Sequence, residues 1–250
     1  MSLRFQRAII VGGSSGMGAE MARQLSADGA AVAIVGHRAE ELAEVAARLN
    51  AGGKGRVSTA VHDVRNYDEA PALFERLAGE MGGLDLIIYA AGIMHVPEES
   101  VYDFAQDRAQ MEINVVGGMA WTSLAAARFE AQRSGTIVGL SSIAGERGRR
   151  SMPGYTTSKA ALTAWLEALR NRVSRYGVNV VTVKPGIVDT AMTKDIVRKP
   201  MMISAERAAS LILATARRGG SPSAFIPAQW QLVALVLRHL PSGIFRRLDL

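Results

Sequence analysis

The chain has 250 residues and a formal net charge of +6 at pH 7, carried mostly by arginine. Few aromatic residues and no basic helical stripe accompany this charge. It therefore indicates a phosphate-bearing ligand or an anionic surface rather than nucleic acid. It contains no cysteine, which excludes disulfides, thiol catalysis and cysteine-ligated zinc, and its four histidines are too scattered to predict a metal site. The length predicts a single domain over residues 1–250, in which residues 224–250 form an apolar and basic C-terminal extension.

Short apolar runs rich in β-branched residues alternate with longer amphipathic stretches. Strands are expected at residues 7–11, 31–35, 56–61, 84–89, 136–140, 178–183 and 223–226. Helices are expected at residues 18–28, 40–49, 68–79, 104–133, 155–176 and 205–216. This alternation predicts an α/β fold: a doubly wound, Rossmann-type parallel sheet of about seven strands with helices on both faces.

Ligands of such sheets bind beyond the carboxyl ends of the strands. Polar, glycine-rich segments follow four of the expected strands: GGSSGMG, YAAG, SSIAG and KPGIVDT. The sequence therefore predicts one ligand site along this edge of the sheet.

The first of these segments lies between a strand and a helix, in RAIIVGGSSGMGAEMARQL. Gly12, Gly16 and Gly18 can provide a tight turn, a close backbone approach to a pyrophosphate and close helix–strand packing. The backbone N–H groups at the start of the helix would face the anion. A flexible turn in a glycine-rich chain is the alternative, but the strand–turn–helix context favours phosphate binding.

The Gly-x3-Gly-x-Gly spacing resembles that of the short-chain dehydrogenase/reductase family, from Arg7 to about Ile226. Further motifs follow in the family's order: HDV at Asp63, YAAG, INVVG at Asn114, SSIAG at Ser142, YTTSK and PGIVDT. The resemblance implies an oxidoreductase that interconverts a carbonyl and a secondary alcohol with a nicotinamide cofactor. The alternative is a catalytically silent cofactor-binding sensor or scaffold of the same fold.

The end of the second strand distinguishes the two nicotinamide cofactors. Gly36 stands where NAD-selective relatives place an acid, and His37 and Arg38 follow it. Because arginine offers a fork suited to phosphate, we expect NADP(H), with NAD(H) as the alternative. Arg38 could also merely open a surface helix.

The resemblance implies further cofactor contacts. Asp63 would contact the adenine ring, although a lone aspartate after a strand could equally cap a turn. Ile187 would meet the carboxamide of the nicotinamide, with Thr190 nearby. The remaining expected contacts are Ser14, Ser15, Met17, Val64, Ala91, Gly92, Pro185 and Gly186.

Tyr155 and Lys159 are spaced so that a helix brings them onto one face, although this pair alone proves nothing. The resemblance implies that Tyr155 is the general acid/base and that Lys159 lowers its pKa and holds the ribose of the cofactor. Ser142 would bind the substrate oxygen, while Ser141 would point the other way. Asn114 would hold a water that links Lys159 to solvent. Each residue alone could be an ordinary surface or loop residue.

Some positions depart from the family pattern. Val11 stands in place of a threonine, and Tyr89 and Ala90 replace two asparagines that brace the loop in relatives. We expect these changes to compensate each other, apolar for polar on both sides.

Two segments beside the expected cleft bear on the substrate. Arg147, Arg149 and Arg150 could dock a carboxylate, a CoA phosphate or an acyl-carrier protein, or belong to a solvated loop. Residues 191–203 occupy the position of the family's mobile substrate lid. The apolar lid residues predict a lipophilic, 3-oxoacyl-type carbonyl or alcohol; they are Met192, Met201, Met202 and Ile203.

The stretch Gln231 to Leu240 is apolar nearly all round. Packing against a second subunit or roofing the cleft is the favoured interpretation; the other is a membrane interface, with Arg238, Arg246 and Arg247 near lipid phosphates. The sequence has no export signal and no run of 18 apolar residues. We therefore expect a cytoplasmic protein that is either free or bound to the surface of a membrane. The resemblance implies a homodimer or homotetramer that pairs through the helices containing Asn114 and Tyr155.

Overall fold

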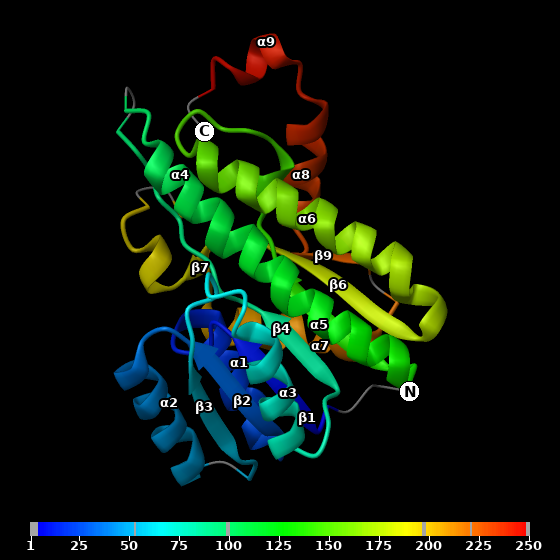
Figure 1. Cartoon of the computed structure of the whole chain (residues 1–250). Helices are drawn as coiled ribbons and strands as arrows, with labels where there is room; N and C mark the ends of the chain where they lie inside the picture. Colours follow the sequence, from blue (N-terminus) through cyan, green and yellow to red (C-terminus); the bar gives the residue numbers. More distant parts are fainter. Residues whose placement is uncertain (1–4, 53, 99–100, 197–198, 221, 249–250) are drawn as a thin grey trace.

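The computed structural model describes residues 5–52, 54–98, 101–196, 199–220 and 222–248. Seven strands form a parallel sheet in the order β3-β2-β1-β4-β5-β6-β9, with helices on both faces (Figure 1). The expected doubly wound sheet is confirmed.

The main sheet contains the expected strands, with ends that shift by a few residues. Its strands are β1 (Arg7–Val11), β2 (Ala31–Gly36), β3 (Val57–Val61), β4 (Leu86–Tyr89), β5 (Gly135–Leu140), β6 (Val178–Pro185) and β9 (Ser223–Ile226). Two short strands that were not expected, β7 (Val188–Asp189) and β8 (Ile203–Ser204), pair with each other. They bracket the segment expected as a lid, of which residues 197 and 198 lie outside the described residues.

The helices cover the two faces of the sheet. They are α1 (Gly16–Ala27), α2 (Ala39–Gly52), α3 (Ala70–Glu80), α4 (Phe104–Met111), α5 (Gly117–Gln132), α6 (Pro153–Val173), α7 (Ala205–Arg218), α8 (Trp230–His239) and α9 (Ser242–Phe245). The single helix expected over residues 104–133 is interrupted, because the π-helical turn η1 (Glu112–Val116) separates α4 from α5. Shorter 3-10 turns occur at η2 (Ile143–Glu146), η3 (Ser174–Tyr176) and η4 (Ala191–Thr193).

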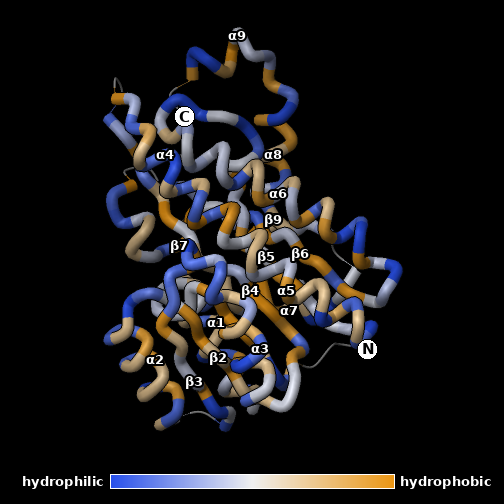
Figure 2. The backbone as a smooth tube through the Cα atoms, in the orientation of Figure 1, coloured by the Kyte–Doolittle hydropathy of each residue, from blue (hydrophilic) through white to orange (hydrophobic). Residues whose placement is uncertain are grey.

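Alternation along the buried strands divides the core into two layers. On β1, Ala8 and Ile10 pack in the layer that contains residues of α1 and α7, whereas Ile9 and Val11 pack in the layer with residues of α3, α5 and α6. Figure 2 shows the strands as an apolar centre between helices of mixed hydropathy. A sheet buried on both faces needs these continuous apolar strands. Its polar functional residues therefore lie in the loops at its carboxyl edge.

Candidate active site

The glycine loop after β1 lies against the loop after β4. Gly12 has φ +91, and a Cβ added there would lie 2.4 Å from the backbone nitrogen of Ala91. A Cβ added to Gly18 would lie 2.0 Å from the carbonyl oxygen of Gly12. Both positions therefore need glycine, because any larger residue would force the two loops or the helix apart.

A groove of about 290 Å³ runs along this carboxyl edge. Helix α1 points its N-terminus into it, and the side chain of its N-cap residue, Ser15, makes no capping hydrogen bond. The first N–H groups of α1 are thus available to an anion, which fits the pyrophosphate of a dinucleotide. The expected cofactor residues that line the groove are Gly12, Ser14, Ser15, Gly16, Met17, Gly18, His37, Arg38, Asp63, Val64, Ala91, Gly92 and Thr190.

Arg38 folds back over the glycine loop. One of its terminal nitrogens lies 2.9 Å from the hydroxyl oxygens of both Ser14 and Ser15. The other terminal nitrogen pairs with Glu41 at 2.7 Å, on the first turn of α2. A guanidinium and two hydroxyls therefore meet at the end of β2, where the ribose of a dinucleotide lies in this fold.

Asp63 is both a turn residue and part of the groove. Its carboxylate accepts a hydrogen bond from the backbone N–H of Arg65 at 3.0 Å and forms an ion pair with the Arg65 guanidinium at 2.5 Å. The hydrogen bond from the Arg65 side chain is the main reason that the pKa of Asp63 falls to about 2. The two roles considered for this residue are thus compatible.

Tyr155 and Lys159 lie one turn apart on α6, and both are buried. The Lys159 ammonium is 5.7 Å from the centre of the Tyr155 ring and donates a hydrogen bond of 2.9 Å to the carbonyl of Leu140. Burial lowers the pKa of Lys159 to about 8. Burial also raises the pKa of Tyr155, while a hydrogen bond with Ser142 and the charge of Arg149 act in the opposite direction.

The two serines that follow β5 point to different places. The Ser141 hydroxyl donates to the carbonyl of Lys159 at 2.8 Å and lies 2.7 Å from the hydroxyl of Thr163, so it serves to attach α6 to the sheet. Ser142 is instead near Tyr155, whose pKa it lowers, and its oxygen accepts from the backbone N–H of Ala144 at 3.1 Å. The structure therefore brings Ser142 and Tyr155 together and turns Ser141 away.

Asn114 lies within the π-turn η1 and is fully buried. Its amide accepts from the backbone N–H of Ile93 at 2.8 Å and donates to the carbonyl of Ile93 and to the hydroxyl of Ser158, both at 2.9 Å. A Cβ added to Gly92 would lie 3.1 Å from the Asn114 oxygen and 3.3 Å from the Lys159 nitrogen. The amide and the ammonium thus converge beside Gly92, and π-turns are frequent at functional sites.

Tyr89 corrects one expectation. We expected its replacement of an amide to be a change from polar to apolar, yet its hydroxyl donates a hydrogen bond to the carbonyl of Ile113 in η1. Its ring fits against two glycines, since a Cβ added to Gly117 would lie 2.6 Å from the hydroxyl oxygen and one added to Gly118 3.1 Å from the ring. The substitution is thus a different polar brace rather than the loss of one.

The expected nicotinamide contacts lie beside the groove. The Gly186 N–H donates to the carbonyl of Ile226 at 2.9 Å, and a Cβ on Gly186 would lie 1.9 Å from the indole nitrogen of Trp230. Pro185 is buried at the end of β6, and Ile187 packs against a small cluster that contains Trp230 and Ile143. The C-terminal extension therefore forms part of the wall next to these residues.

The arginines expected at the rim of the cleft have separate roles. Arg147 donates to the carbonyl of Leu237 at 2.8 Å and to that of Leu240, and it stacks 4.3 Å from the ring centre of Phe245. The expectation that Arg147 docks a ligand or lies in a solvated loop is wrong, because the extension occupies its guanidinium. Arg149 interacts with Tyr155 through its charge, and burial lowers its own pKa.

Several residues at the site were not among the expected cofactor contacts. The groove is also lined by His62, Arg65, Ala90, Ile93, Ile113 and Met192. Beside it, Glu146 forms a buried ion pair with Lys184 at 2.7 Å and also pairs with Arg238 on α8. The sequence could have indicated Arg65 as a partner of Asp63, because it lies only two residues away. It could not have indicated the partners of Glu146, because they are distant along the chain.

Comparison with known proteins agrees with this geometry. The family model for short chain dehydrogenases matches residues 6–200. An uncharacterised oxidoreductase of Mycobacterium tuberculosis is 31% identical over 242 residues, covering 96% of each chain. A short-chain type dehydrogenase/reductase from Mycobacterium ulcerans superposes with a TM-score of 0.83 at 23% identity, over 99% of this chain and 100% of the other. A short chain dehydrogenase from Burkholderia cenocepacia, solved in complex with NADP, gives a TM-score of 0.83 at 25% identity and 100% coverage of both chains.

Proposed function

Because the chain belongs to the short-chain dehydrogenase/reductase family and is an NAD(P)-dependent oxidoreductase, we propose that it uses NADP(H) to interconvert a carbonyl group and a secondary alcohol. The observation that carries the proposal is the buried phenol of Tyr155, one helical turn from the buried Lys159 and close enough to Ser142 for that hydroxyl to lower its pKa, beside a groove suited to a dinucleotide.

Tyr155 acts as the general acid when a carbonyl is reduced and as the general base in the reverse direction. The hydroxyl of Ser142 is near enough to lower the pKa of Tyr155, so a substrate oxygen placed between the two hydroxyls would meet both. A nicotinamide cofactor held in the groove would supply or accept the hydride. Burial keeps bulk water from competing for this proton, and it also raises the pKa of the phenol.

Lys159 and Asn114 support the acid/base group. With a pKa of about 8, Lys159 is mostly protonated at neutral pH and presents a cation within one helical turn of Tyr155. Asn114 ends beside the same ammonium, so a water held there could return a proton to Tyr155 through Lys159. This relay is the role proposed for Asn114.

The preference for NADP(H) is supported by the cluster of Arg38, Ser14 and Ser15. A 2′-phosphate could replace the two hydroxyls as the partner of the guanidinium and form charge-assisted hydrogen bonds. Gly36 leaves no carboxylate to repel that phosphate, and the relative from Burkholderia cenocepacia was solved with NADP.

A binding titration tests this preference. We expect NADPH to bind at least about tenfold more tightly than NADH, a difference of roughly 1.4 kcal/mol. Arg38→Leu should remove most of this difference by weakening NADPH alone. Arg76→Leu, which breaks an exposed ion pair with Glu80 on α3, is the matched control and should change neither affinity. Tighter binding of NADH by the unaltered protein would refute the preference.

The substrate is proposed to be lipophilic, such as a 3-oxoacyl-type compound. Met192, Met201 and Met202 are exposed on the segment expected as a lid, where flexible thioethers can adapt to an apolar ligand. Ile143, the residue after Ser142, and Ile187 pack with Trp230 in an apolar cluster next to the site.

A panel of apolar and polar carbonyl compounds, followed by NADPH absorbance, tests the reaction. We expect turnover of apolar ketones or oxoacyl thioesters, and its loss in Tyr155→Phe with NADPH binding retained. Full activity of Tyr155→Phe would contradict the mechanism. The alternative of a silent sensor depended on the altered YAAG segment, and Tyr89 is well accommodated there, so no observation favours it.

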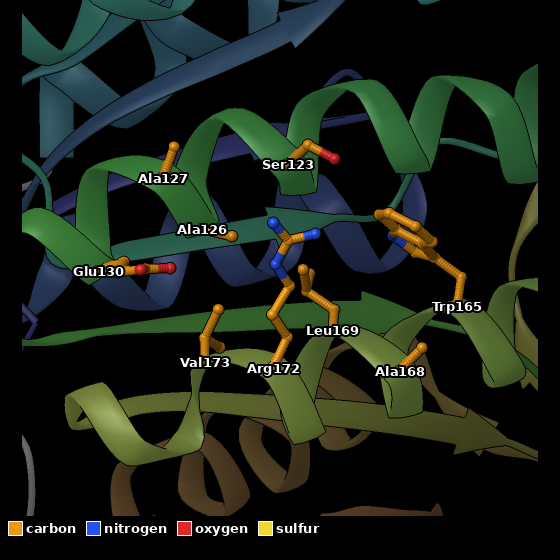
Figure 3. A pocket seen from close by; sticks show the side chains of 9 residues that line it. All are labelled: Ser123, Ala126, Ala127, Glu130, Trp165, Ala168, Leu169, Arg172 and Val173. Carbon is orange, nitrogen blue, oxygen red and sulfur yellow. The ribbon is translucent and has the colours of Figure 1, made fainter.

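We also propose that copies of the chain pair through the outer face of α5 and α6. A hollow of about 290 Å³ lies between these helices, and Figure 3 shows Arg172 extending across it. The small side chains of Ala127 and Ala168 on this face allow another helix pair to approach closely. Ala168→Glu should therefore lower the molar mass measured by light scattering, whereas an unchanged mass would refute this pairing.

A further inference from the structure

Helix α8 carries an apolar stripe that the rest of the chain leaves exposed. Leu232, Leu235 and Val236 are 70%, 55% and 60% exposed, and their spacing places them on one side of the helix. Ile244 and Leu248, which follow α8, are exposed as well. We call these five residues the tail patch.

The opposite side of α8 is held in the protein. Trp230, Ala234 and Leu237 are buried, and the first two pack against Ile143, the residue after Ser142. Because this side is already occupied by the core, the tail patch cannot be buried by turning the helix over.

Polar contacts hold the extension in place as well. Arg147 donates to the carbonyl of Leu237 at 2.8 Å and to the hydroxyl of Ser242 at 3.1 Å, so it bridges α8 and α9. Arg238 bonds the carboxylate of Glu146, which in turn is paired with the buried Lys184. Figure 1 shows α8 and α9 projecting from one end of the molecule. The tail patch is therefore a fixed outer surface rather than the side of a loose tail.

The charged residues of the stretch that carries the patch, 230–248, are all basic. No acidic residue occurs between Glu206 and Asp249. Within the described part of the chain, the exposed Arg246 and Arg247 form no ion pair. Exposed leucines next to unneutralised arginines suit a surface that is apolar inside and anionic outside.

We propose that the tail patch docks the protein on the surface of a bilayer that contains anionic lipids. The apolar side chains would enter the interface while Arg246 and Arg247 meet lipid phosphates. No helix in the described part of the chain is long and apolar enough to cross a membrane, so the attachment is peripheral. A second copy of the chain is a poorer partner, because a two-fold contact puts the same patch on both subunits, and residues 207–248 offer no carboxylate to Arg246 and Arg247.

The docked orientation would bring the bilayer close to the reaction site. Ile143 connects Trp230 of α8 to Ser142, so the surface that meets the lipid is one packing layer from the substrate oxygen site. A lipophilic substrate could then enter from the membrane without crossing water. The docking itself does not depend on the proposed reaction, and its test requires no turnover.

Co-sedimentation of the full chain with vesicles tests the proposal. We expect binding to phosphatidylcholine vesicles that contain about 30% phosphatidylglycerol, little binding to phosphatidylcholine alone, and weaker binding as salt rises from about 50 to about 500 mM. The triple variant Leu232→Ser, Leu235→Ser and Val236→Ser should bind at least about tenfold more weakly, because it removes the apolar part of the contact. Arg246→Gln with Arg247→Gln should lose the salt-dependent part.

Val61→Ser is the matched control, since Val61 is 61% exposed on β3 and lies outside the tail patch, and it should bind vesicles as the unaltered protein does. All three variants alter exposed side chains, so unchanged melting temperatures would confirm that they fold. Equal sedimentation of the unaltered protein and the triple variant would overturn the proposal. The proposal would also be overturned if the unaltered protein did not bind vesicles and the triple variant changed from dimer to monomer in light scattering. The patch would then be an interface between copies.

Discussion

The hydroxyl of Tyr89 donates a hydrogen bond to the backbone carbonyl of Ile113, the residue before Asn114. The π-turn shifts the backbone pairing, so that the N–H of Gly117 reaches the carbonyl of Glu112 rather than that of Ile113. Tyr89 thus provides the Ile113 carbonyl with a partner and stabilises the turn that aims Asn114 at Ile93 and Ser158.

Tyr89→Phe should therefore cost about 1–3 kcal/mol of unfolding free energy, because it removes the hydrogen-bond donor that meets the part-buried carbonyl of Ile113. It should also lower kcat more than it raises KM, since Asn114 is proposed to return protons rather than to bind substrate. Urea unfolding and steady-state kinetics measure the two effects. Tyr102→Phe is the control, because Tyr102 is 99% exposed and should tolerate the change. Identical unfolding curves for the two variants would show that the hydrogen bond is unimportant.

The neighbouring serines provide a second test. Ser142→Ala should reduce kcat by roughly 10²–10³, because the reacting oxygen loses a positioned hydrogen-bond donor. Ser141→Ala should instead cost about 1 kcal/mol of stability, because its hydroxyl attaches α6 to the sheet, and it should affect kcat much less. If Ser141→Ala proves the more harmful variant for kcat, the assignment of the substrate oxygen site is wrong.

The pH dependence of stability should reveal the burial of Lys159. Its pKa in the folded protein is about 8, below the ordinary value of 10.5, so between these pH values the unfolded chain binds more protons than the folded one. The contribution of this group to the free energy of unfolding therefore rises as pH increases from 8 towards 10.5. Urea unfolding at several pH values should show this rise in the unaltered protein relative to Lys159→Met.

The same titration should limit activity in alkaline solution. As pH passes about 8, Lys159 loses its proton and Tyr155 loses the neighbouring cation, so kcat should fall. A profile that stays flat to pH 10 would mean that the charge of Lys159 is not needed for the reaction.

Glu146 should be among the most sensitive acidic residues of the protein. Its side chain is 4% exposed and pairs with that of Lys184, which is 5% exposed. Glu146→Gln would leave this ammonium buried without an anion, and we expect a loss of about 3–5 kcal/mol in thermal or urea unfolding. Glu75→Gln removes an ion pair with Arg128 in which the carboxylate is 63% exposed, and should cost about 0–1 kcal/mol. Similar losses for the two variants would contradict the role given to burial.

Local patterns explain why much of the fold was predictable. A buried parallel strand needs a continuous apolar run, and a dinucleotide loop needs glycines at particular positions along the chain, so β1 and the turn from Gly12 to Gly18 could be recognised without coordinates. The π-turn was not recognised, because Glu112–Val116 continues an ordinary helical pattern and differs only in its backbone hydrogen bonding.

The sequence by itself determined the order of strands and helices, the glycine loop, and the spacing that places Tyr155 and Lys159 on one face of a helix, since all of these depend on residues close together in the chain. Only the tertiary structure decided that Tyr89 braces the turn before Asn114, that Arg147 holds the C-terminal extension, and that the tail patch remains outside. These contacts join residues that are distant along the chain. They depend on how whole helices and strands pack together, and a local sequence pattern does not predict that packing.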